Sequence, residues 1–350
     1  MRSLTTPKWV SVIGILLATL FVAIEKTQET TLLTVSLIFA AWLAIALHEM
    51  GHVVFGKRAG FKFGFFTVGP IQVEKTSSGI KVTENKNWTF FGGVALMLPP
   101  EVKKEILIKK WATFAAGGPL TSILITLLSF MFYIIFTYEF LLFFTIMNAG
   151  IFIATIVPLK GSMKTDGYVL LSLLNKDKAH KVIDELLIMR ELLGKKKPSD
   201  WNQEYIKAAK QKEASLENLQ YAMLIYYHEI EKHGFQAAVD TMKEYREIPI
   251  TKKNQFQLGF LIHMQQLSLF LQENPSLKEI VVLQNQLSNI EPFSFTRGKA
   301  MIAFLENDEP KANEYIDKVK KMISESEGMY GFFQAEKTLT SLLEKRMKVE

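Results

Sequence analysis

Cysteine is absent from the 350 residues of the chain. A chain without cysteine can form neither a disulfide framework nor a thiolate metal site, so any metal must be bound by histidine, aspartate or glutamate. The sequence also lacks a basic stripe with interleaved aromatic residues, and its net charge of +6 is modest. We therefore assign the basic residues to the surface of a membrane, and we expect no nucleic-acid partner.

Charged residues are scarce in the first half of the chain only. Apolar residues make up 49% of the whole sequence, an ordinary value for a globular protein. The first half, however, contains long runs of Leu, Ile, Phe, Ala and Val, whereas the second half is rich in Lys, Glu and Gln. This asymmetry predicts a membrane-embedded domain at 1–175 and a cytoplasmic helical domain at 176–350.

Apolar runs that approach the ~20 residues needed to cross a bilayer occur four times. They are Trp9–Ile24, Thr31–Phe55, Trp111–Phe136 and Phe140–Leu159. No small-residue cleavage pattern ends the first run, so we expect a retained transmembrane helix and not a signal peptide. Basic residues precede the first run and are concentrated between the second and the third, which places both termini in the cytoplasm. The cysteine-free, Lys/Glu-rich composition is compatible with a bacterial cell membrane.

The segment between the second and third runs contains predicted β-structure. Phe61–Val73 and Gly79–Thr83 alternate apolar and polar residues around a Thr-Ser-Ser-Gly turn, which is typical of a β-hairpin. The apolar stretch that follows, Trp88–Leu98, is too short to cross the membrane. We expect it to lie at the membrane interface.

From about Lys176 onward the sequence predicts helices separated by turn residues. The breaks fall at Gly234, Pro249, Pro275, Pro292 and Pro310. Helix pairs recur at about 35–42 residues, a spacing that is weakly similar to tetratricopeptide repeats. The predicted fold is an all-α polytopic membrane protein with a small membrane-associated β-hairpin, followed by an all-α soluble domain of helix pairs.

The segment His48-Glu49-Met50-Gly51-His52 has the spacing of a zinc site. In a helix of ~3.6 residues per turn the two imidazoles share one face, and Glu49 can serve as general base toward a metal-activated water. A chance match is the alternative for any short motif. These ionisable groups lie inside an apolar run, however, where each costs about 2–3 kcal/mol to insert. Groups kept at that cost are usually functional, so we predict a zinc hydrolase site.

The HExxH motif within a membrane span resembles the site-2 protease family of intramembrane zinc metalloproteases. The resemblance covers about Thr31–Leu174. It implies hydrolysis of membrane-spanning or membrane-tethered protein substrates near the cytoplasmic face, with His48 and His52 as zinc ligands and Glu49 as the base. It also implies a third ligand from an Asp-Gly pair after a later span. The match is Asp166, in Thr-Asp-Gly.

The resemblance is incomplete around Asp166. The family often has Asn-x-x-Pro shortly before Asp-Gly, but here Thr155 occupies the Asn position before Pro158 and the segment that follows is longer than usual. A turn or helix-capping role is therefore a second interpretation of Asp166. Asn148 lies two turns upstream of Thr155, and it either donates a hydrogen bond to the oxyanion of the reaction or packs between helices.

Other parts of the sequence leave further alternatives open. Ala115–Leu120 matches a small-residue Gly-Pro element of the family, and Ser122 stands where the family often has Asn. The predicted hairpin could hold a substrate as an added strand, or it could be an interfacial anchor. The C-terminal domain could recognise a substrate or a protein adaptor. The alternative function is a membrane-anchored helical-repeat interaction protein with a vestigial metal site, which the retained Glu49 argues against.

Overall fold

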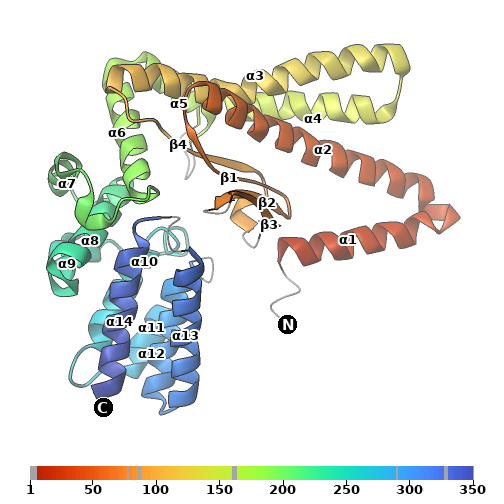
Figure 1. Ribbon diagram of the computed structural model, residues 1–350. Coiled ribbons are helices and arrows are strands. Elements are labelled where there is room, and N and C mark those ends of the chain that lie inside the picture. The colour runs from red at the N-terminus through yellow and green to blue at the C-terminus, as the bar shows by residue number, and fades with distance from the viewer. Residues whose placement is uncertain are drawn as a thin grey trace. The chain divides into compact units, whose positions relative to one another are not determined.

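The computed structural model of the chain describes residues 6–76, 79–85, 88–159, 164–288, 291–326 and 330–349. The chain divides into two compact units, Met1–Leu186 and Leu187–Glu350, and each is described here by itself (Figure 1). The first unit contains the long apolar helices and a small sheet. The second contains helices and short 3₁₀ turns.

Among the described residues, three helices of the first unit are long and apolar enough to cross a membrane: α2 (Glu25–Arg58), α3 (Lys104–Phe136) and α4 (Glu139–Ile156). Helix α1 (Pro7–Val22) is apolar but has only 16 residues. It is therefore about 24 Å long, less than the ~30 Å hydrocarbon core. Of the four predicted spans, the structure thus gives three candidates and one shorter apolar helix.

Helix α2 begins earlier than the sequence predicted. The second apolar run was placed from Thr31, but residues 25–30 form the first turns of α2. Glu25 lies at the helix N-terminus, where a carboxylate interacts favourably with the helix dipole. Helices α3 and α4 lie side by side and antiparallel (Figure 1), and a hydrogen bond of 2.8 Å joins the Ser129 and Thr145 hydroxyls.

The first unit also contains a four-stranded antiparallel sheet in the order β3-β2-β1-β4. Its strands are β1 (Lys62–Val68), β2 (Ile71–Thr76), β3 (Gly79–Glu84) and β4 (Val94–Leu98). The predicted hairpin corresponds to β2 and β3, and a turn at Gly69-Pro70 separates β1 from β2. The apolar stretch after the hairpin contains a further strand that the sequence did not predict, because residues 94–98 pair with β1 as an edge strand. Its place at the membrane interface stays a prediction. The residues of β4 do not alternate between apolar and polar, because the side chains on both faces of this strand are at least partly buried.

The sheet lies along the C-terminal half of α2. Three close approaches show this: Met97 lies against Gly56, Gly93 against Glu49, and Gly69 against Trp42. Trp42 and Gly56 are 14 residues apart on α2, which corresponds to about 21 Å. The sheet therefore packs along the part of α2 that contains the HExxH motif.

Two shorter helices complete the first unit: α5 (Asp166–Leu174) and α6 (Lys176–Leu192), whose last turns extend into the second unit. Gly167 of α5 packs against the backbone carbonyl of Ile156 at the end of α4. The Lys104 ammonium group forms a 2.6 Å ion pair with Asp184, which joins the start of α3 to α6. The Gly167 contact thus places α5 against the end of α4, while the ion pair joins α6 to α3.

The second unit is helical throughout its described residues. Its helices are α7 (Gln203–Lys210), α8 (Leu219–His233), α9 (Phe235–Thr241), α10 (Gly259–Phe270), α11 (Leu277–Gln286), α12 (Pro292–Leu305), α13 (Glu309–Ser326) and α14 (Phe333–Val349), with 3₁₀ turns η3 (Pro198–Asp200), η4 (Leu216–Asn218) and η5 (Glu244–Glu247). Gly234 separates α8 from α9, and Pro292 begins α12, as their positions in the sequence predicted. Membership of a repeat family stays a prediction.

A buried polar chain joins four helices of the second unit. Arg297 is fully buried and forms a 2.6 Å ion pair with Glu336. Its Nε also donates a 2.9 Å hydrogen bond to Nε2 of His263, while the Tyr227 hydroxyl donates to the other Glu336 oxygen at 2.7 Å. Burial, together with the Arg297 charge, holds the pKa of His263 well below its usual range, so the imidazole is a neutral acceptor. Each of these polar side chains has a hydrogen-bond partner, so this buried network fixes how α8, α10, α12 and α14 pack against one another.

Candidate metal centre

One face of α2 is buried and carries both histidines of the motif. The buried residues of this helix are Ala40, Ala44, His48, Gly51, His52, Val53 and Gly56. Their spacing follows the helical period, and most of them are small, which lets neighbouring helices approach closely. At the crossing with α3, a Cβ on Gly51 or on Gly117 would lie closer than 3.0 Å to the backbone of the other helix. The histidine side chains therefore extend directly over α3.

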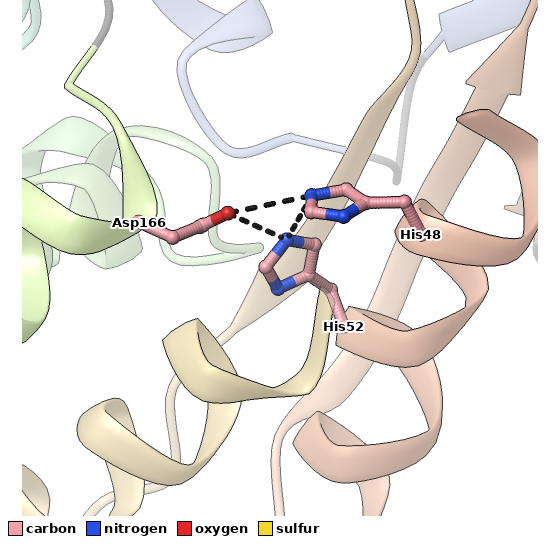
Figure 2. Close-up of side chains that lie close together, drawn as sticks. All are labelled: His48, His52 and Asp166. Carbon is pink, nitrogen blue, oxygen red and sulfur yellow. Dashed lines mark hydrogen bonds and ion pairs between the residues drawn. The ribbon is translucent and has the colours of Figure 1, made fainter. Parts of the chain in front are cut away.

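The ring nitrogens of His48 and His52 converge with a carboxylate oxygen of Asp166, as Figure 2 shows. The Nε2 atom of His48 lies 3.3 Å from Oδ2 of Asp166, and Nε2 of His52 lies 3.4 Å from the same oxygen. The two Nε2 atoms are 3.3 Å apart. Both histidines are buried, whereas the Asp166 side chain is partly accessible.

The triangle formed by these three atoms has the dimensions of a zinc site. A tetrahedral zinc ion with bonds of about 2.0–2.1 Å to nitrogen and oxygen ligands separates those ligands by about 3.3–3.4 Å. The observed separations of 3.3, 3.3 and 3.4 Å match this value. Two imidazoles and one carboxylate also form a donor set that Zn²⁺ uses in hydrolases. The residues present therefore fit the metal.

Helix α3 contacts the far side of both imidazoles. Nδ1 of His52 is 2.9 Å from the backbone carbonyl oxygen of Phe114, and Nδ1 of His48 is 2.9 Å from the Ser122 hydroxyl. Gly118 lies halfway between them in sequence, and a Cβ at this position would be closer than 3.0 Å to Nε2 of both histidines. Residues 114, 118 and 122 share one face of α3, because they are separated by four residues each.

The N-terminus of α5 determines the position of Asp166. Thr165 is the N-cap, and its hydroxyl accepts from the backbone N–H of Tyr168 at 3.3 Å and donates to the Val157 carbonyl at 2.7 Å. The capping role considered for Asp166 is thus filled by the preceding residue. The Asp166 carboxylate is free to turn toward α2, and the contact of Gly167 with α4 holds it there.

Glu49 lies against the sheet. The backbone N–H of Ala95 in β4 donates to its carboxylate, and Gly93, just before β4, packs against its side chain. Glu49 does not belong to the ligand triangle, although it directly follows His48 in the sequence. A carboxylate beside the metal ligands but not among them has the position that a general base requires.

Asn148 is fully buried on α4. Its Nδ2 donates to the Phe144 carbonyl at 2.8 Å, while its Oδ1 has no hydrogen-bond partner in the described part of the chain. The unused atom is an acceptor, so this orientation suits a peptide N–H better than an oxyanion. No hydrogen bond among the described residues joins Asn148 to the metal ligands, and its catalytic role stays a prediction.

A buried pair of imidazoles and a carboxylate, with a glutamate beside them and helices long enough to cross a bilayer, defines a membrane metalloenzyme. The family pattern of Peptidase family M50, the site-2 protease family, matches residues 36–328, and the chain belongs to this family. It is therefore a zinc metalloendopeptidase and an integral membrane protein. No curated protein and no solved structure matches the chain.

The family match confirms the resemblance that the motif indicated, and it extends further along the chain. The sequence resemblance ended near Leu174, whereas the match continues to residue 328, through most of the second unit. The sequence also gave no indication of the supporting roles of Phe114, Gly118 and Ala95. Phe114 and Gly118 are four residues apart and Ala95 lies within a short apolar run, but their contacts depend on which helices and strands pack together.

Proposed function

We propose that this enzyme cleaves membrane-spanning or membrane-tethered proteins within the cytoplasmic side of a bacterial cell membrane, with both chain termini in the cytoplasm. The observation that carries this proposal is the ligand triangle of His48, His52 and Asp166, which is built on a candidate membrane span. A metal site within such a helix acts on peptide bonds that lie at the same depth as the helix.

The proposed roles follow from the positions of the side chains. His48, His52 and Asp166 would hold zinc, which when bound supplies a Lewis acid that acidifies water and polarises the scissile carbonyl. The Glu49 carboxylate would take the proton of the attacking water and deliver it to the nitrogen of the leaving amine. Ala95 keeps this carboxylate in place through its backbone N–H.

The flanking charges indicate the depth of the site. On α2, Lys57 follows His52 by five residues, and on α3, Lys110 precedes Gly118 by eight. At 1.5 Å per helical residue these separations correspond to about 8 and 12 Å. Lysine side chains near a membrane helix end reach the cytoplasmic interface. We therefore place the scissile bond roughly 10 Å inside the cytoplasmic boundary of the hydrocarbon core.

Cleavage-site mapping tests this depth. A panel of single-span peptides is reconstituted with the enzyme in vesicles, and the products are identified by mass spectrometry. We expect cuts about two helical turns inside the cytoplasmic end of the peptide's membrane span, because each turn rises about 5.4 Å. Cuts confined to the soluble flanks, or cleavage of soluble peptides alone, would contradict the proposed function.

We further propose that the substrate is held as an added strand on β4. Strands β3 and β4 are the two edges of the described sheet. Of these two edges, β4 lies beside Glu49, because the N–H of Ala95 donates to the Glu49 carboxylate. A protease must hold its substrate extended, and an open strand edge provides main-chain hydrogen bonds for that purpose. The chosen edge thus differs from the β2–β3 hairpin that the sequence suggested.

Disulfide trapping tests the choice of edge, and the absence of cysteine from the chain makes single-cysteine variants unambiguous. Val94→Cys on β4 and Ile80→Cys on β3 are each placed in an inactive Glu49→Gln background and combined with substrates that carry one cysteine at successive positions. We expect cross-links from Val94→Cys at alternate substrate positions, because strand side chains alternate between faces. Ile80 is 69% exposed and is the matched control. Equal or stronger trapping at Ile80→Cys would refute pairing on β4.

A further inference from the structure

Among the residues that the structure describes, Ser122 provides the side-chain hydroxyl that contacts a histidine of the metal centre. It is fully buried on α3, and its Oγ lies 2.9 Å from Nδ1 of His48. The equivalent contact of His52 is made by a backbone carbonyl, that of Phe114. One ligand is thus oriented by the main chain, and the other depends on a single side chain.

We propose that Ser122 is a positioning residue that fixes the tautomer and orientation of His48 for metal binding, an inference that rests on the ligand assignment of the proposed function. Nε2 of His48 faces Asp166 and His52, so this nitrogen must be unprotonated to bind a metal. The ring proton then resides on Nδ1 and is donated to the Ser122 oxygen. A partner on the second ring nitrogen fixes the ligand's tautomer and raises its basicity.

Among the described residues, the Ser122 hydroxyl is the hydrogen-bond partner that the structure gives to Nδ1 of His48. The position one turn earlier on α3 is Gly118, which offers no side-chain hydroxyl in its place. Without the hydroxyl, the buried Nδ1–H would be unpaired, and the imidazole would favour the other tautomer or another orientation. His52 would be unaffected, because its contact with the Phe114 carbonyl does not involve Ser122.

The test compares zinc affinity in the purified full-length protein by competition with a chromophoric chelator. We expect Ser122→Ala to weaken zinc binding about 10- to 100-fold, which is typical for loss of a residue that orients a metal ligand. Ser122→Thr retains the hydroxyl and should recover most of the affinity. Ser129→Ala is the matched control, because Ser129 is also buried on α3 but bonds to Thr145, away from the metal ligands.

A second measurement separates positioning from general damage to the fold. The Co²⁺-substituted enzyme reports ligand geometry through its visible absorption spectrum. We expect this spectrum to change in Ser122→Ala and to remain that of the wild type in Ser129→Ala.

Unchanged zinc affinity and an unchanged cobalt spectrum in Ser122→Ala would overturn the inference, as would an equal loss in Ser129→Ala. If the wild type itself bound no zinc, the proposed metal centre would fail instead, so the two failures are distinguishable.

Discussion

Replacement of Gly118 by alanine is expected to abolish zinc binding. The new methyl group would lie closer than 3.0 Å to Nε2 of both His48 and His52, which are the atoms that face the metal. The histidines cannot move aside cheaply, because their Nδ1 atoms are bound to Ser122 and Phe114 on the same face of α3. The helices cannot separate either without disrupting the close Gly51–Gly117 crossing.

Metal analysis of the purified variant measures this effect. The wild type should contain about one zinc per chain, as the one ligand triangle among the described residues indicates, and Gly118→Ala less than about a tenth of that amount, with a parallel loss of cleavage. Gly150→Ala is the control: Gly150 lies within α4, and a Cβ there would meet nothing within 4 Å. Zinc should be retained in this control. Full zinc content in Gly118→Ala would show that the ligands do not converge over α3 as described.

The helices and the HExxH motif were predictable because both signals are local. Apolar runs of sufficient length form membrane helices whatever their partners, and two histidines four residues apart share a helix face by geometry alone. The first apolar run also forms a helix, but α1 has 16 residues, slightly fewer than the ~20 needed to cross a bilayer. Asp166 was different: nothing in its own neighbourhood distinguishes a ligand from a turn residue, and its prediction required the family resemblance.

Strand β4 and the supporting face of α3 were not predictable, because they depend on contacts between distant segments. Val94–Leu98 is a short apolar run whose pairing with β1 leaves no alternating pattern in the sequence. Gly118 and Ser122 look like ordinary packing residues of a membrane helix until α2 is placed against them. The sequence therefore predicted the three residues that converge in the candidate metal centre, whereas the groups that contact them became visible only in the folded chain.

Glu49→Gln should separate metal binding from catalysis. Glutamine has nearly the same shape as glutamate, and its carbonyl oxygen can still accept from the Ala95 N–H that the carboxylate now binds. Glu49 does not belong to the ligand triangle, so zinc should remain at about one per chain. The amide cannot accept a proton from water, however, and cleavage of single-span peptides should fall about 10²- to 10⁴-fold.

Asp166→Ala supplies the contrast to this variant, because it removes one of three ligands and should lose zinc together with activity. Both proteins are purified in detergent and assayed side by side for metal content and for peptide cleavage. Near wild-type cleavage by Glu49→Gln would exclude Glu49 as the base, and loss of zinc from Glu49→Gln would make Glu49 a ligand. Retention of zinc by Asp166→Ala would remove Asp166 from the metal centre. Zinc must therefore be kept by Glu49→Gln and lost by Asp166→Ala if Asp166 binds the metal and Glu49 transfers the proton.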